Sequence, residues 1–411
     1  MNFFTKSILA GLLPCATVSA QSLYSIAPND DEAAESLPLT YVAGVNFGFD
    51  DNPTPLFGGL NSNDGGATFL SGFVQANWTN VTPQTTWDVF ARLGVRFYLD
   101  GLEGTNVDDT VYSARAGVNY THRFSERLRF SSRNFLAYEI EPDFDFSIGS
   151  DIRSGQYFRW STDNSIGYRW TDRLGTQTGV TFSGIVFEDL DDSDFNTITL
   201  RHDFRYRFSP QTVITGGYRY RTVNNDAGGD TGSHFLVGGV EHRISPTSAI
   251  VLRAGAQITD PDGGGSTGAP FIEAALRSQL TSQLNTNVFA RYSSEGFNRS
   301  LIDLAGNRFN FEDSQTFRVG ARATYALNPR VSLFGGINVI LTSYDDQILN
   351  PGDVPATGDQ ETIFHANAGA SYQLNDNLFL TSSYNFTNAD SDFSGRSFSR
   401  NRVQVGIQTT F

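Results

Sequence analysis

Hydrophobic and polar residues alternate along most of this chain with a period of two. The clearest run is TWDVFARLGVRFYLD at 86–100, in which seven apolar residues from Trp87 to Leu99 share one face. The other face carries Asp88, Phe90, Arg92, Gly94, Arg96 and Tyr98. Seven successive matches to a two-residue period exclude a helix and predict a β-strand. Shorter runs at 112–120, 250–258 and 317–323 predict further strands of the same kind.

A short turn pattern divides the chain into pairs of such strands. Each copy places a hydroxyl or amide side chain, able to bond the backbone two residues on, before residues that favour tight turns. The copies are VTPQT at 81–85, FSERL at 124–128, WTDRL at 170–174, FSPQT at 208–212, ISPTS at 244–248, LTSQL at 280–284, LNPRV at 327–331 and LNDNL at 374–378. Longer acidic, glycine-rich stretches separate the two strands between consecutive turns. Eight tight turns with a strand at each end predict about 18 strands, with 16 as the alternative.

Aromatic residues at both ends of the apolar faces favour a membrane-spanning sheet over a large soluble sandwich or propeller. Trp87 and Phe97 bracket one aliphatic face, and Tyr112 and Tyr120 bracket the next. Strands of about ten residues, joined alternately by short turns and long loops and bearing such aromatic girdles, are typical of transmembrane β-barrels. We therefore predict an all-β fold, a closed antiparallel transmembrane β-barrel.

The N-terminus, MNFFTKSILAGLLPCATVSAQ, has the pattern of a secretory signal peptide. Lys6 precedes an apolar run that is too short to span a bilayer and is interrupted by Pro14. Val18-Ser19-Ala20 has the form of a cleavage site. The predicted organisation is a signal peptide at 1–20, a short periplasmic segment at 21–39 and a single barrel domain at 40–411.

Charge, cysteine and histidine content exclude several functions. The formal net charge of −15 argues against a nucleic-acid partner. The single cysteine, Cys15, lies in the predicted signal peptide; a lipoprotein site there is disfavoured by Pro14, and disulfides and thiol catalysis are not expected. No GxSxG motif is present, and of five histidines only His365 is predicted to face inward. We predict no enzymatic activity, no cofactor and no metal.

The chain ends on QVGIQTTF, an alternating strand that stops at an aromatic residue. A barrel lacks free edges only if its last strand pairs with its first, so this strand is predicted to pair with YVAGVNFGF at 41–49. The ending also resembles the signal read by the bacterial outer-membrane insertion machinery, although Thr409 departs from the expected large apolar residue. The residues carrying that resemblance are Gln404, Gly406 and Phe411.

At the family level the chain resembles the porin-like β-barrels of the β-barrel porin 2 group, some of which accompany exopolysaccharide export. The resemblance rests on GVNFGFDDNPTP at 44–55 and on the YRFSP-type turns. It implies a bacterial outer-membrane location, reached by export across the inner membrane. Outer-membrane lipid and lipopolysaccharide would surround the barrel, and the barrel assembly machinery would insert it.

Arginine dominates the face predicted to point inward, where Asp88, Asp163, Asp203, Glu241 and Glu273 are far fewer. Rings of arginine set selectivity in pores, so one interpretation is a wall that favours anions. The other is that these arginines fill the interior, paired with carboxylates and inward loops. Most acidic residues lie in the long connections and oppose the wall. The predicted lumen-lining arginines are Arg92, Arg96, Arg115, Arg129, Arg133, Arg159, Arg201, Arg205, Arg219, Arg253, Arg277, Arg291, Arg318, Arg322 and Arg402.

A barrel of about 18 strands has an interior too wide for side chains alone to fill. We therefore predict a porin-like channel for passive diffusion of small hydrophilic solutes. One alternative is a polysaccharide export or uptake pore, which would require a continuous aromatic and arginine track. The other is a structural or adhesive barrel plugged by its loops, for which an inward fold of loop 297–315 or 346–361 would be diagnostic. Assembly into a homo-oligomer is left open.

Overall fold

The computed structural model describes most of the chain from residue 37 onward. The predicted signal peptide at 1–20 and nearly all of the predicted segment 21–39 lie outside the described residues. Within the described part, no helix is long and apolar enough to cross a membrane. The described residues are 37–53, 66–100, 109–140, 156–188, 194–226, 230–262, 265–295, 300–302, 308–349, 355–356, 358–393 and 396–411.

The described residues form one 18-stranded antiparallel sheet and one separate two-stranded hairpin, β14–β15. Strands that follow one another in sequence are neighbours in the sheet, except that β13 pairs with β16 because β14 and β15 lie outside the sheet. The strands are β1 (Leu37–Asp50), β2 (Ala67–Val81), β3 (Thr85–Tyr98), β4 (Thr110–Arg123), β5 (Leu128–Glu139), β6 (Tyr157–Arg169), β7 (Leu174–Phe187), β8 (Phe195–Arg207), β9 (Thr212–Asn225), β10 (Thr231–Ser245), β11 (Ser248–Pro261), β12 (Thr267–Gln279), β13 (Leu284–Ser294), β14 (Ser300–Ile302), β15 (Arg308–Asn310), β16 (Ser314–Asn328), β17 (Val331–Tyr344), β18 (Gln360–Gln373), β19 (Leu378–Ser391) and β20 (Phe398–Thr410).

The last strand closes the sheet on the first, as predicted. β20 pairs with β1 in an unbroken register from Val42 opposite Thr410 to Asp50 opposite Arg402. Beyond that register, the N–H of Phe411 donates to the carbonyl of Tyr41 at 2.8 Å, and the reverse bond measures 3.2 Å. The predicted closed antiparallel barrel of 18 strands is therefore confirmed.

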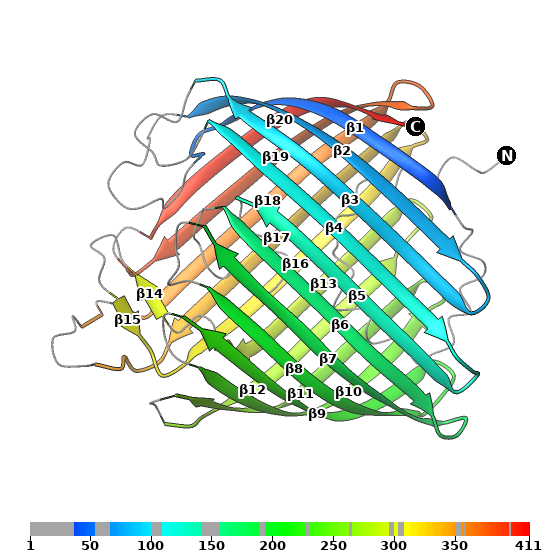
Figure 1. Cartoon of the computed structure of the whole chain (residues 1–411), viewed down its shortest axis with the longest axis vertical. Helices are drawn as coiled ribbons and strands as arrows, with labels where there is room; N and C mark the ends of the chain where they lie inside the picture. The colour runs from blue at the N-terminus through cyan, green and yellow to red at the C-terminus, as the bar shows by residue number, and fades with distance from the viewer. Residues whose placement is uncertain are drawn as a thin grey trace.

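All eight predicted turns join consecutive strands, and their hydroxyl or amide residues act as expected. Ser125 Oγ accepts bonds from the N–H groups of Arg127 and Leu128 at 3.2 and 3.1 Å. Asn375 Oδ1 does the same for Asn377 and Leu378 at 3.0 and 2.9 Å. These turns gather at one end of the strongly tilted strands and the long connections at the other (Figure 1).

Exposed apolar side chains cover the outside of the barrel. In β1 the alternate residues Tyr41, Val45, Phe47 and Phe49 are all exposed, and their neighbours turn the other way. Phe208, beside a turn, is also exposed. This apolar surface with aromatic residues at its margin is the lipid-facing surface expected of a membrane barrel.

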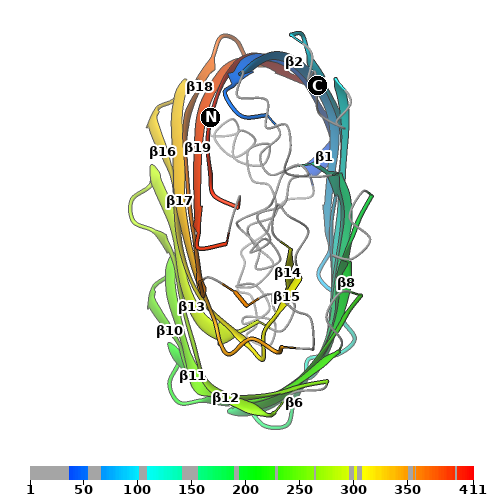
Figure 2. The same ribbon diagram turned by 90° about the vertical axis from the view of Figure 1, so that its left-hand side faces the viewer.

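Viewed from the long-connection end, the barrel is oval rather than round (Figure 2). The hairpin β14–β15 lies inside this outline. Several strands also extend further than the sequence indicated: β1 begins at Leu37, Glu139 belongs to β5, and Asn388–Ser391 belong to β19 rather than to a loop. The backbone ladder continues past the apolar zone, where polar residues no longer show the alternation.

Inward-facing phenylalanines lie over glycines of the adjacent strand. A Cβ added to Gly117 would stand 2.3 Å from the ring of Phe90, and one added to Gly320 would stand 2.3 Å from the ring of Phe289. Aromatic rings that cover strand glycines protect the backbone and help to fix the register. These rings therefore line the wall rather than project across the lumen.

Substitution of Gly255 should weaken the wall. Gly255 faces inward on β11, and an added Cβ would stand 2.0 Å from the carbonyl oxygen of Leu236 on β10. Since backbone must move, Gly255→Ala should lower the free energy of unfolding by about 1–3 kcal/mol. Urea unfolding of the refolded barrel measures this. Gly238→Ala is the control, because its Cβ would meet nothing closer than 3.9 Å. Equal midpoints for the two variants would contradict the prediction.

Candidate functional site: the channel interior

The arginines singled out from the sequence occupy strand positions that alternate with exposed apolar residues. On β3, for example, Arg92 and Arg96 flank the outward Leu93 and Val95. The same alternation sets Arg201 and Arg205 against Leu200 on β8. By strand, the predicted residues are Arg92 and Arg96 (β3), Arg115 (β4), Arg129 and Arg133 (β5), Arg159 (β6), Arg201 and Arg205 (β8), Arg219 (β9), Arg253 (β11), Arg277 (β12), Arg291 (β13), Arg318 and Arg322 (β16) and Arg402 (β20).

Several of these arginines pair with carboxylates on nearby strands. Arg205 binds Glu241 through two bonds of 2.8 and 2.5 Å, and both side chains are buried. Arg201 binds Asp163 in the same two-pronged way at 3.0 and 2.6 Å. Bidentate pairs of this kind are geometrically specific and hold both side chains in place. Two further pairs join Arg253 to Glu273 and Arg115 to Glu139.

Three predicted arginines form no ion pair with any described residue. The guanidinium of Arg92 lies 3.8 Å from the centroid of the Phe73 ring, and that of Arg219 lies 5.6 Å from the Phe271 ring. Arg277 faces inward on β12. Contacts with ring faces leave the positive charge of a guanidinium uncancelled.

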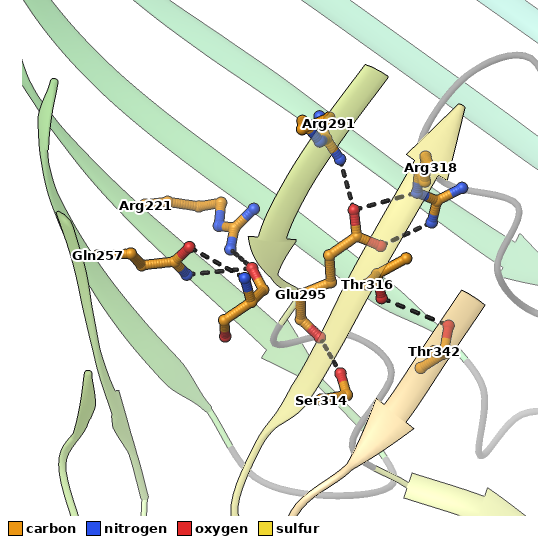
Figure 3. A network of polar contacts seen from close by, with 9 residues as sticks. Arg221, Gln257, Arg291, Glu295, Ser314, Thr316, Arg318 and Thr342 are labelled. Carbon is orange, nitrogen blue, oxygen red and sulfur yellow. Dashed lines mark hydrogen bonds and ion pairs between the residues drawn. The ribbon is translucent and has the colours of Figure 1, made fainter. Parts of the chain in front are cut away.

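The most heavily bonded part of the interior surrounds Glu295, directly after β13 (Figure 3). This carboxylate is completely buried and accepts from Arg291 at 2.5 Å and from Arg318 at 2.6 and 3.2 Å. The main-chain carbonyl of Glu295 accepts a bond from Ser314 Oγ at 2.7 Å. One residue thus joins β13 to β16 at the point where the connection carrying β14 and β15 begins.

The preceding residue, Ser294, is held by strands further round the barrel. Its carbonyl accepts from Arg221 on β9 at 2.9 Å and from Gln257 on β11 at 3.0 Å (Figure 3). Its hydroxyl donates to Asp313 at 2.5 Å, and Asp313 also accepts from Thr267 at 3.0 Å. The start of the connection is therefore fastened inside the barrel.

The electrostatics of Glu295 favour the ionised form. Burial alone would raise the pKa of this carboxyl, but the charges of Arg318 and Arg291 and the hydrogen bonds from both outweigh burial. The pKa of Glu295 is therefore held below its usual value. The ion cluster stays intact at neutral and mildly acidic pH.

The far end of the same connection is held by aromatic packing. Phe309 and Phe311 are buried in a cluster with Tyr344 and Phe393. The Phe311 ring centroid lies 4.8 Å from that of Tyr344 and 5.8 Å from that of Phe393. Residues 346–349 contribute as well, since the N–H of Ile348 donates to Asn310 at 2.7 Å. The described parts of loop 297–315 thus fold inward.

Several polar residues that organise the interior were not foreseen from the sequence. Arg221 and Arg400 continue the alternation of Arg219 and Arg402, so a stricter reading of the period would have found them. Others lie at strand ends or in connections, where no period exists. The unforeseen pairs are Arg400 with Asp50 at 2.5 Å, Arg396 with Glu361 at 2.6 Å, and Arg318 and Arg291 with Glu295.

Two residues of the predicted insertion signal lie on β20, and the third, Phe411, directly follows the strand. Gln404 and Gly406 face inward, and a Cβ on Gly406 would stand 2.0 Å from Asn46 Oδ1. Phe411 is 70% exposed at the turn end. Their recognition by an insertion machinery stays a prediction.

The described residues contain no group of three or more His, Cys, Asp or Glu side chains that could hold a metal. His365, the inward histidine, bonds Thr387 Oγ1 at 2.9 Å. The predicted lack of a metal, a cofactor and catalysis remains a prediction.

Comparison with known proteins agrees with this architecture. Residues 248–411 match the family model described as outer membrane protein beta-barrel domain. The chain has the fold of an outer-membrane β-barrel. Because that description is broad and the match spans less than half of the chain, the narrower resemblance to the β-barrel porin 2 group stays a prediction. No curated protein matches the chain.

Solved structures with a similar form include an outer membrane protein, a porin and a third bacterial protein. OpdK of Pseudomonas aeruginosa is 12% identical, with a TM-score of 0.43, and the match covers 91% of this chain and 99% of that one. A BenF-like porin of Pseudomonas fluorescens Pf-5 is 14% identical, with a TM-score of 0.43 and coverages of 90% and 98%. OccAB4 of Acinetobacter baumannii is 12% identical, with a TM-score of 0.41 and coverages of 92% and 99%.

Replacing Glu295 should loosen the inward connection. Glu295→Gln leaves Arg291 and Arg318 close together without their shared counter-charge, and breaking a buried ion pair in this way costs about 3–5 kcal/mol. We expect a lower urea midpoint and faster cleavage by trypsin within the connection. The control is Glu126→Gln, since the Glu126 side chain is 95% exposed.

The stability of wild type and of Glu295→Gln, measured as a function of pH, tests the sign of the pH effect. Because the folded-state pKa of Glu295 is lowered, its contribution is complete above the unfolded glutamate pKa of about 4.3. The contribution is lost as pH falls through the lower folded value. The stability difference between wild type and Glu295→Gln should thus be constant from pH 7 to 5 and shrink only below that range. A difference already shrinking at pH 6 would contradict this account.

Proposed function

We propose that the protein is a passive outer-membrane channel for small hydrophilic solutes, with a preference for anions set by its inward arginines. The observation that carries the proposal is the uneven pairing of charge in the interior. Arg201 and Arg205 form ion pairs with carboxylates, whereas Arg92, Arg219 and Arg277 form none with any described residue. The unmatched guanidinium groups leave net positive charge along the wall, and such charge draws anions into a pore.

The polysaccharide-pore alternative receives less support, because it needs aromatic ring faces that a sugar can stack on. The Phe73 ring has Gly44 against one side, where a Cβ would stand 2.5 Å away, and Arg92 over it at 3.8 Å. The Phe69 ring is similarly placed between Gly48 and Arg96, whose guanidinium is 4.9 Å from the ring centroid. Because both faces of these rings are occupied, the rings pack within the barrel wall and offer no face on which a sugar can stack.

A barrel plugged by its own loops is the second candidate. The anchoring of the connection at Glu295 and again at Phe309 and Phe311 favours it, because a connection fixed at both ends inside the barrel narrows the lumen. The two candidates differ in whether ions pass.

Planar-bilayer recording of the refolded protein decides between them. We expect steady single-channel steps and, under a salt gradient, a reversal potential of the sign given by anion preference. Silence from protein shown to be folded by its heat-dependent gel mobility would overturn the channel and leave the plugged barrel. A reversal potential of the cation-selective sign would support an open channel but contradict the proposal that the inward arginines set an anion preference.

Single-charge variants test that role directly. A unit charge about 10 Å away in water changes the energy of an ion by roughly 0.4 kcal/mol, or about twofold in occupancy. Arg219→Gln should therefore lower the anion-to-cation permeability ratio about fourfold at low salt, because anions lose and cations gain about twofold in occupancy. The matched control is the double variant Arg205→Gln with Glu241→Gln, which removes a neutral pair and should leave the ratio unchanged.

A further inference from the structure

Arginine recurs at the last inward position of strands that run toward the turns. The sequences HRF, YRW, YRF and HRI place Arg123, Arg169, Arg207 and Arg243 directly before the turns that follow β4, β6, β8 and β10. Since short turns of outer-membrane barrels face the periplasm, these arginines border the periplasmic mouth. None of them is among the arginines predicted to line the lumen.

Three of these arginines, Arg169, Arg207 and Arg243, share a pocket on the inner rim. The pocket has a cavity volume of about 90 Å³, is open to solvent, and extends from the end of β6 to the end of β10. The wall residues Gly175 and Val213 line its floor, which places it on the inward side. Its charged lining consists of Arg169, Arg173, Arg205, Arg207 and Arg243 with only Asp172 and Glu241.

The positive charge of the pocket is poorly neutralised. Glu241 is already bound by both prongs of Arg205. Arg169 has a single ion pair, at 4.0 Å, to an exposed glutamate, and exposed pairs of this kind contribute little. The side chains of Arg173, Arg207 and Arg243 form no hydrogen bond or ion pair within the described part of the chain.

The backbone holds these side chains close to one another. The N–H of Arg207 donates to the carbonyl of Arg173 at 2.7 Å, and the N–H of Arg243 donates to that of Gln211 at 2.8 Å. Adjacent strands lie about 4.8 Å apart, so arginines on β8 and β10 start roughly 10 Å apart and can reach a common centre. Guanidinium groups match the oxygens of carboxylates and phosphates.

We propose that this pocket binds a small oxyanion carrying two or more negative charges, a di- or tricarboxylate or a polyphosphate, that arrives from the periplasmic side. This assignment rests on the proposed channel function in one respect, because the pocket opens on the lumen of that channel. An ion of single charge would neutralise only part of the excess of three arginines over carboxylates in the lining. A ligand with several charged oxygens engages them together.

The charges at the opposite mouth are the reason for proposing that the oxyanion arrives from the periplasmic side. At the long-connection end, Glu312, Asp313, Asp345 and Asp346 lie together, joined by backbone bonds of 2.9 and 3.0 Å. Partial burial and the neighbouring charges of Asp313, Asp346 and Glu312 raise the pKa of Asp345. These four carboxylates oppose the approach of a multiply charged anion from that mouth, whereas the rim arginines attract one at the turn end.

Equilibrium binding tests the site without requiring an open channel. Isothermal titration of the refolded full barrel with inorganic tripolyphosphate should show a binding event that the triple variant Arg173→Gln, Arg207→Gln, Arg243→Gln weakens at least tenfold. Arg330→Gln is the matched control, since Arg330 occupies a turn on another part of the rim. Citrate in place of tripolyphosphate distinguishes carboxylate from phosphate selectivity. Unchanged binding in the triple variant, or equal weakening in the control, would overturn the site.

Bilayer recording then locates the site. Tripolyphosphate should reduce the current at a lower concentration when it is added on the turn side than on the loop side. The triple variant should abolish this difference and leave the conductance without tripolyphosphate unchanged. An impermeant thiol reagent on Asp376→Cys identifies the turn side. Because heat-modifiable mobility verifies folding of each variant, equal block from both sides refutes the assigned location. If the protein conducts anions but shows no oxyanion site on the turn side, only this inference is refuted. If the protein binds the oxyanion but conducts no ions, only the proposed channel function is refuted.

Discussion

The pairing of β20 with β1 is the constraint on which the rest of the structure depends. In lipid every backbone N–H and C=O must find a partner within the protein, so an open edge is excluded. The register from Val42 to Asp50 satisfies this and at the same time fixes which residues face outward. A slip of one residue would turn every side chain of a strand to the other face. Arginine on the lipid face costs about 2–4 kcal/mol at mid-bilayer, so the inward arginines themselves oppose such a slip.

Closure at this strand number creates an interior that must be polar and yet ordered. Phenylalanines lie over glycines, guanidinium groups lie over phenylalanines, and carboxylates clamp selected arginines. The cluster at Glu295 goes further, because it converts wall charges into an anchor for a connection. The ion pairs thus have a structural role, and the anion preference that we propose rests on the arginines that form no ion pair, such as Arg219.

Sequence reasoning predicted what periodic contacts determine. The turn residues, the strand count, the closing pair and the inward alternation all follow from a period of two and from local turn chemistry. It failed where the period ends: Asn388–Ser391 continue β19 without an apolar signal, and Glu295 and Arg396 lie outside any strand. Whether an inward arginine meets a carboxylate depends on partners such as Glu361 and Asp50, which are distant in sequence from the arginines they bind. Those contacts require the folded barrel.

Charge is distributed along the barrel axis in a way that composition hides. The net charge of −15 suggests an acidic protein, yet five arginines line the pocket around Arg207 at one mouth. At the other mouth the carboxylates around Asp345 lie near the arginines that bind Glu295. At equilibrium such an arrangement cannot drive transport, but it sets the local concentration of anions at each entrance. In the channel that we propose, the arginine rim enriches anions at its entrance, so the first capture step is easier from the turn side. In the channel that we propose, the same fixed charges would slow release there, and the occupancy of that rim would limit the flow of multiply charged anions.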